Sequence, residues 1–161
     1  ETGKIDTNGL TVLNTQGNLQ IDGTVNNKTN ANITNEGNAL NITGEVVNAD
    51  GTITLLNEGP GGLNLADIGI IEAEGLEMIN NGAGGLNIDG TVTNVGTATI
   101  SNNAGNLVVN GTVDNTGNAT LYNNGNTFTV NGTITNKEII NINKLSNFVL
   151  GSNLWIKEFV S

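Results

Sequence analysis

The feature that most constrains this sequence is a Gly-Thr-Val-like triplet that returns at a fixed interval. Gly90, Gly111 and Gly132 each open such a triplet and lie 21 residues apart, and Gly23 and Gly44 repeat this spacing near the start of the chain. A fixed period of this length is typical of a solenoid, in which one repeat forms one coil and cannot bury its apolar face without its neighbours.

Alignment of the repeats on this triplet gives five apolar columns. Two pairs of columns have members two residues apart, such as Leu86 with Ile88 and Ala98 with Ile100, which is the spacing of side chains on one face of a strand. The remaining column lies in the triplet itself and contains Val25, Val46, Ile70, Val92, Val113 and Ile134. Each repeat therefore predicts three short strands and three turns, and Gly and Asn between the strands are expected to form corners with positive φ.

The predicted fold is all-β: a right-handed parallel β-helix of about seven coils with roughly 21 residues per coil. The right hand is expected from the rule for parallel crossover connections. We expect one domain over residues 1–161, with a partial coil at 1–16, six regular coils at 17–144, and a terminal coil or cap at 145–161.

Asparagine forms two further columns, one that follows the triplet column by two residues and one that follows the last apolar column by two residues. The first column contains Asn27, Asn48, Asn94, Asn115 and Asn136, and the second contains Asn35, Asn57, Asn80, Asn102 and Asn123. Stacked amides form hydrogen-bonded ladders, so we expect these residues to be structural and to satisfy turn backbone. The alternative interpretation is an amide row that faces carbohydrate.

The third repeat, residues 61–82, is irregular. It is expected to carry one extra residue before Ile70 and to have Glu72 in place of the column asparagine. Glu74 and Glu77 add two more carboxylates, so Glu72, Glu74 and Glu77 are the candidate specialised surface. The alternative is an insertion that a turn tolerates.

The amino-acid composition limits the partners and the catalytic chemistry that the chain can have. The net charge is −10, the five basic residues are all Lys, and the chain has no Cys or His. Nucleic acids and anionic membranes require a basic face, so neither is expected as a partner. No apolar run reaches the ~18 residues of a membrane span. Without His or Cys, we predict no catalytic residues, no metal site and no cofactor, and hence no enzyme.

The sequence contains incomplete residue patterns for two less favoured functions of β-helices, ice binding and action on polysaccharides. A Thr-x-Thr row of the kind that binds ice includes Thr91 and Thr93 but is interrupted at Glu45. A polysaccharide-acting site would need clustered carboxylates, whereas Asp22 and Asp89 share a column but are separated by two coils without Asp.

The unit from Gly105 to Leu121, Gly-Asn-Leu-Val-Val-Asn-Gly-Thr-Val-Asp-Asn-Thr-Gly-Asn-Ala-Thr-Leu, resembles the repeats of filamentous haemagglutinin-like exoproteins, and the resemblance covers about residues 17–144. It implies a structural or adhesive rod segment of a large bacterial exoprotein, exported by two-partner secretion, in the extracellular space or on the cell surface. The implied partners are a host-cell receptor or glycan and flanking β-helix coils, with a role in host attachment or virulence. The alternative within this resemblance is a segment of a leukotoxin or haemolysin.

Overall fold

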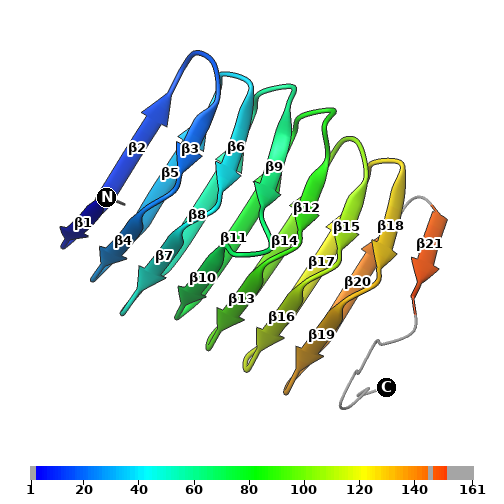
Figure 1. Ribbon diagram of the computed structural model, residues 1–161. Helices are drawn as coiled ribbons and strands as arrows, with labels where there is room; N and C mark the ends of the chain where they lie inside the picture. Colours follow the sequence, from blue (N-terminus) through cyan, green and yellow to red (C-terminus); the bar gives the residue numbers. More distant parts are fainter. Residues whose placement is uncertain (1–2, 145–146, 152–161) are drawn as a thin grey trace.

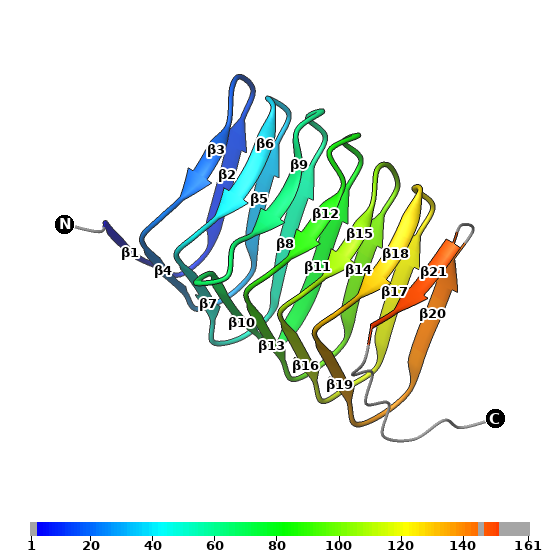
Figure 2. The same ribbon diagram turned by 45° about the vertical axis from the view of Figure 1, so that its right-hand side comes forward.

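The computed structural model describes residues 3–144 and 147–151, and within these ranges the chain forms strands and turns but no helix. Three strands make one coil, and seven coils stack along one axis (Figures 1 and 2). Each strand pairs in parallel with its counterpart on every adjacent coil. The prediction of an all-β parallel solenoid with about 21 residues per coil is therefore confirmed.

The strands are distributed over three sheets of seven strands each. Sheet A contains β1 (Lys4–Thr7), β4 (Thr24–Asn27), β7 (Glu45–Asn48), β10 (Ile70–Ala73), β13 (Thr91–Asn94), β16 (Thr112–Asn115) and β19 (Thr133–Asn136). Sheet B contains β2 (Leu10–Asn14), β5 (Ala31–Asn35), β8 (Thr52–Asn57), β11 (Gly75–Asn80), β14 (Ala98–Asn102), β17 (Ala119–Asn123) and β20 (Ile140–Lys144). Sheet C contains β3 (Leu19–Ile21), β6 (Ala39–Ile42), β9 (Gly62–Leu65), β12 (Leu86–Ile88), β15 (Leu107–Val109), β18 (Thr127–Val130) and β21 (Asn147–Leu150).

The core lies between the three sheets and consists of the side chains that point inward from each strand. In β13, Val92 is buried, whereas Thr91 and Thr93 are exposed on the outer face. Parallel sheets are normally covered on both faces, but here only the inner face is covered, and many outer positions, such as Thr91 and Thr93, carry short polar side chains. Leu63 and Leu86 stack in register and are fully buried, and each such side chain contributes about 1.5–3 kcal/mol of burial free energy.

The glycine of the repeated triplet is required by close approach between coils. The N–H of Thr112 donates to the Gly90 carbonyl at 3.0 Å, which draws Gly111 against Gly90. A Cβ on Gly111 would lie 2.0 Å from that carbonyl oxygen. Gly111 and Gly90 are not among the glycines with positive φ, which include Gly105 at 71°. Steric contact across the coils is therefore the reason for glycine in the triplet, whereas positive φ is found at other corner glycines, such as Gly51 at 81°.

The irregular coil has a different register from the predicted one. Ile71, not Ile70, lies opposite Val46 and Val92, so two extra residues, not one, precede the column position. Ala73, not Glu72, lies opposite Asn94. The insertion is absorbed by a turn in which the Gly69 N–H donates to the Ala66 carbonyl at 2.8 Å. Because two Ile residues are adjacent, the period of two could not tell which one points inward.

The first and last described strands, β1 and β21, lie at opposite ends of the coil stack (Figure 2). Strands β1 and β2 fall in the expected partial coil at 1–16 and pair in register with β4 and β5. Strand β21 falls in the segment 145–161, where a terminal coil or cap was expected, and pairs with β18. Residues 145–146 and 152–161 of that segment lie outside the described residues.

Candidate functional site

The second asparagine column forms an unbroken chain of hydrogen bonds along the inside of one corner. The Nδ2 atom of each asparagine donates to the Oδ1 atom of the next one, as in Asn57 to Asn80 (3.0 Å), Asn80 to Asn102 (2.9 Å) and Asn102 to Asn123 (2.8 Å). Asn35 donates to Asn57 at 2.7 Å in the same way. All five side chains are fully buried.

The ladder also begins one coil earlier than the sequence analysis placed it. Asn14 donates to the Oδ1 atom of Asn35 at 2.6 Å. Asn14 lies two residues after Val12, which pairs with Ile33 of the last apolar column. The spacing that defines this column, two residues after the last apolar column, therefore also applies to Asn14.

Several ladder amides also hydrogen-bond to the backbone of a turn. Besides the next asparagine, Nδ2 of Asn80 reaches the Gly82 carbonyl at 2.7 Å, and Nδ2 of Asn115 reaches the Gly117 carbonyl at 2.6 Å. Amide side chains thus satisfy carbonyls at corners where the backbone leaves the sheet ladder. Because a buried polar group without a partner costs about 1–3 kcal/mol, this satisfaction makes the corners compatible with a dry interior.

The first asparagine column is interrupted at the irregular coil. Asn27 donates to Asn48 and Asn94 donates to Asn115, both at 2.6 Å, and Asn115 donates to Asn136 at 2.7 Å. Between Asn48 and Asn94 the column position is Ala73. The Oδ1 atom of Asn94 is consequently buried without a hydrogen-bond partner.

The corner at Ala73 is also shorter than the corresponding corners on the coils before and after it. From Ala73 to Leu76, the first inward residue of β11, the chain advances three residues, whereas it advances four from Asn94 to Ala98. A shorter turn between longer ones leaves a recess on the outside of the corner. We call this recess the corner notch; its volume is about 490 Å³, and its lining residues are Val47, Asn48, Ala49, Asp50, Glu72, Ala73, Glu74, Thr93 and Val95.

The corner notch combines carboxylates with apolar surface. Glu72 and Glu74 are exposed, and Val95, on the opposite side of the short turn, is 61% exposed. The Gly51 N–H donates to Glu74 Oε2 at 2.9 Å, so this carboxylate bridges two successive turns. A concave surface with this chemistry fits a ligand that has a cationic head and an apolar stem, such as a lysine or arginine side chain.

Two of the three candidate glutamates therefore line one recess, and the third does not. Glu77 lies on the outer face of β11, opposite Thr54 and Thr99, and does not line the notch. Asp50, Val47 and Val95 line the notch but were not predicted, because only the unequal lengths of successive turns bring them together. Among residues 3–144 and 147–151, no group of three His, Cys, Asp or Glu side chains is placed to hold a metal ion.

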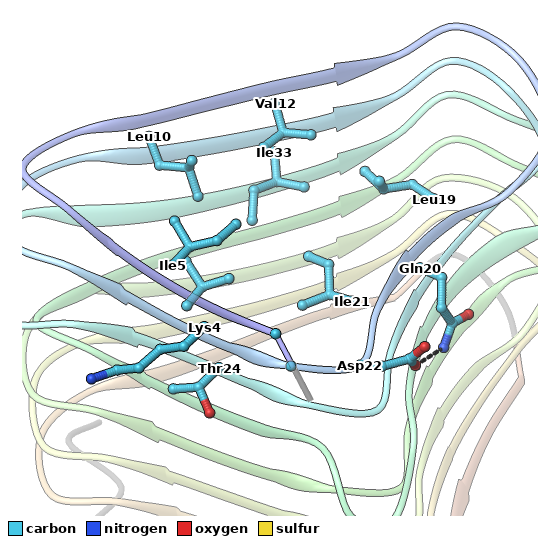
Figure 3. Close-up of a pocket in the computed structure, with 13 residues that line it drawn as sticks. Lys4, Ile5, Leu10, Val12, Leu19, Gln20, Ile21, Asp22, Thr24 and Ile33 are labelled. Carbon is cyan, nitrogen blue, oxygen red and sulfur yellow. Dashed lines mark hydrogen bonds between the residues drawn. The ribbon is translucent and has the colours of Figure 1, made fainter. Parts of the chain in front are cut away.

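A second hollow lies at the N-terminal mouth of the solenoid (Figure 3). Its volume is about 320 Å³, and side chains from β1, β2 and β3 point into it, including Ile5, Leu10, Val12 and Ile21. On its rim, Asp22 accepts hydrogen bonds from Thr43 Oγ1 and, at 2.6 Å, from Gln20 Nε2. These hydrogen bonds, that from Thr43 first, lower the pKa of the Asp22 carboxyl below its usual value.

The fold and the ladders define the class of this protein: it is a β-solenoid repeat protein with polar corner ladders. Comparison with protein-family models, with curated proteins and with solved structures found no match. The described part of the chain contains no helix of the length and apolar character that a membrane span requires.

Proposed function

We propose that this chain is a structural and adhesive rod segment of a bacterial exoprotein that is secreted or exposed on the cell surface. The observation that carries the proposal is the continuity of all three sheets through seven coils, which makes a rod of roughly 34 Å at ~4.8 Å per coil. The resemblance of the repeat unit to filamentous haemagglutinin-like exoproteins supports the bacterial origin, and a partner such as a host-cell receptor or glycan belongs to this proposal.

The rod is suited to a mechanical role because the packing of its interior restricts the movement of each coil relative to the next. Ladder asparagines at two corners and fully buried Leu and Ile columns join every coil to the next. Regular β-solenoids transmit order from coil to coil, since each repeat is stabilised mainly by its neighbours. A segment of this kind holds whatever it displays at a fixed distance and orientation.

The corner notch is the part of the lateral surface that we assign to adhesion. Its carboxylates favour a cationic group, and Val47 and Val95 favour an apolar stem. The chain carries a net charge of −10, which adds a long-range attraction for a basic partner surface. A basic segment of a host receptor is therefore the ligand that this surface fits best.

The test is saturable binding of the fluorescently labelled chain to a panel of host cells. The double variant Glu72→Gln/Glu74→Gln removes both charges but keeps an acceptor for the Gly51 N–H. Exposed ion pairs contribute about 0.2–1 kcal/mol each, so binding should weaken about 2- to 30-fold. The matched control Glu77→Gln removes a charge outside the notch and should bind like the unmodified chain.

Circular dichroism decides whether each variant is folded. Absence of binding by the folded, unmodified chain would contradict the adhesive part of the proposal and leave a spacer. Binding that is lost equally in Glu77→Gln would show general charge attraction and contradict the assignment to the notch.

A further inference from the structure

We propose that the outer face of sheet C binds a neutral glycan chain that lies along the rod. The site is formed by the outward side chains of β6, β9 and β12, three strands that lie side by side (Figure 2). These side chains are Asn41, Asn64 and Asn87, and we call them the outer amide row. The corner notch belongs to sheet A and the turns beside it, so the inference adds a second ligand class and does not depend on binding at the notch.

The first observation is that the outer amide row is a hydrogen-bonded ladder on the surface. Asn87 Nδ2 donates to Asn64 Oδ1 at 2.8 Å, and Asn64 Nδ2 donates to Asn41 Oδ1 at 2.9 Å. Unlike the two buried asparagine columns, these side chains are partly exposed. A carboxamide has two N–H donors and two acceptor lone pairs, so the ladder leaves each of them a donor and an acceptor. These groups form a preordered array that repeats every ~4.8 Å.

The second observation is that the outer amide row departs from what a strand favours. Each of its asparagines lies inside a strand, between two buried apolar residues. Asparagine is depleted in strands, and further along the same face the equivalent positions are Val108 and Thr129, which strands favour. Departures from local preference are expected at functional sites. Ligand binding accounts for asparagines that strand formation does not require.

The third observation is a second polar row, at the corner where the chain passes from sheet C to sheet A. Asp89, two residues after Asn87, accepts a hydrogen bond from Asn110 Nδ2 at 2.7 Å. Asn110 Oδ1 in turn accepts one from Asn131 Nδ2 at 2.8 Å. All three members of this corner row are exposed. The face therefore offers two neighbouring rows of groups that hydrogen-bond to hydroxyls, so that one sugar unit can be bound at two points.

The charges of this face decide the kind of ligand. The chain has a net charge of −10 and no basic residue between Lys28 and Lys137, which disfavours phosphate, sulfate and carboxylate ligands. The central outward position of sheet C is uncharged on every strand from β3 to β18. Its residues are Gln20, Asn41, Asn64, Asn87, Val108 and Thr129. A chain of neutral, hydroxyl-bearing units is the ligand that matches such a surface.

The turn after β9 adds an apolar group to this surface. The turn carries the insertion of the irregular coil and directly follows the strand that holds Asn64. Ile68, in the turn, is 71% exposed. A sugar ring has C–H groups on its face and hydroxyls at its edge, so an aliphatic side chain can cover the face while amides bind the edge. The irregular coil thus supplies both kinds of contact.

The test measures binding of fluorescently labelled linear hexasaccharides to the purified full chain by fluorescence polarisation. The neutral probes are hexamers of β-linked glucose, α-linked glucose, N-acetylglucosamine and mannose, and the anionic probe is a galacturonate hexamer. At least one neutral probe should bind saturably, with an affinity that rises from the dimer to the hexamer because a longer chain reaches more coils. The galacturonate hexamer should not bind, since the chain is acidic.

The double variant Asn64→Val/Asn87→Val removes two amides and inserts the residue that β15 has at the same position, so the fold should be kept. Loss of one hydrogen bond from each amide should weaken glycan binding about 5- to 100-fold. Thr129→Val is the matched control in the same row and should bind like the unmodified chain. The notch variant Glu72→Gln/Glu74→Gln should also bind the glycan normally, so the two sites can fail independently.

Circular dichroism establishes that each variant is folded. Absence of binding of every neutral probe by the folded chain would overturn the proposal. Full binding by Asn64→Val/Asn87→Val would do the same, because the outer amide row would then not be the site. Equal binding of the galacturonate hexamer would contradict recognition of a neutral ligand.

Discussion

The side-chain amide of Asn80 donates to the Oδ1 atom of Asn102 across 2.9 Å, and both side chains are completely buried although they are 22 residues apart in sequence. A second hydrogen bond from the same amide reaches the Gly82 carbonyl at 2.7 Å. One side chain therefore joins two coils and closes one turn. This double role explains why the corner position is asparagine and not a residue with an apolar side chain.

Replacement of Asn80 by Ala should lower the free energy of unfolding by about 2–5 kcal/mol, because the Oδ1 atom of Asn102 and the Gly82 carbonyl lose a buried donor. Urea denaturation followed by circular dichroism measures the change. The neighbouring Asn81 is exposed, and Asn81→Ala should change stability by no more than about 0.5 kcal/mol. Equal effects of the two variants would show that burial of the ladder is not what stabilises the corner.

Replacement of Ala73 by Asn should complete the first ladder. The new amide would lie between Asn48 and Asn94 and give the buried Oδ1 atom of Asn94 a donor. We expect a gain of about 0.5–1.5 kcal/mol, the typical net value of one hydrogen bond. Thermal denaturation measures it, with Ala83→Asn at an exposed position as the control. A loss of stability would show that the short turn has no room for the larger side chain.

Replacement of Gly111 by Ala should destabilise the fold, because the added Cβ would lie 2.0 Å from the Gly90 carbonyl oxygen. Overpacking of this kind costs about 1–3 kcal/mol. Gly3 heads the same column but has no atom within 4 Å of such a Cβ, so Gly3→Ala should leave the denaturation midpoint unchanged. If Gly111→Ala were as stable as Gly3→Ala, contact between coils would not be the reason for glycine in the triplet.

The Asp22 carboxyl should titrate below its ordinary pKa of 3.8, because Thr43 and Gln20 donate hydrogen bonds to its ionised form. A pKa lowered by folding stabilises the folded state above the unfolded-state pKa, and this stabilisation is lost as the pH falls below about 4. Carboxyl carbon NMR shifts report the titration midpoint. Thr43→Val removes the larger of the two causes and should raise the pKa; an unchanged midpoint would argue against the hydrogen bond from Thr43.

Repetition allowed the solenoid to be predicted from the sequence. A period of 21 residues fixes which residues share a column, and the alternation within Leu86–Ile88 or Ala98–Asn102 fixes which side chains point inward. In a stack of parallel coils, like residues necessarily lie over like. The sequence position alone therefore places Asn57 and Asn80 in one column, and the two residues are indeed paired in register.

Tertiary structure decided the features that depend on how one coil differs from the next. Adjacent Ile70 and Ile71 have the same hydropathy, so only pairing with Val46 and Val92 selects Ile71 for the core. The corner notch exists because the turn after Ala73 is shorter than its neighbours, and the requirement for Gly111 comes from a carbonyl on another coil. The repeat thus determines which residues each coil contains. Contacts between coils of unequal length determine the recesses of the surface and the positions where only glycine fits, because these contacts depend on distances between segments that are far apart in the sequence.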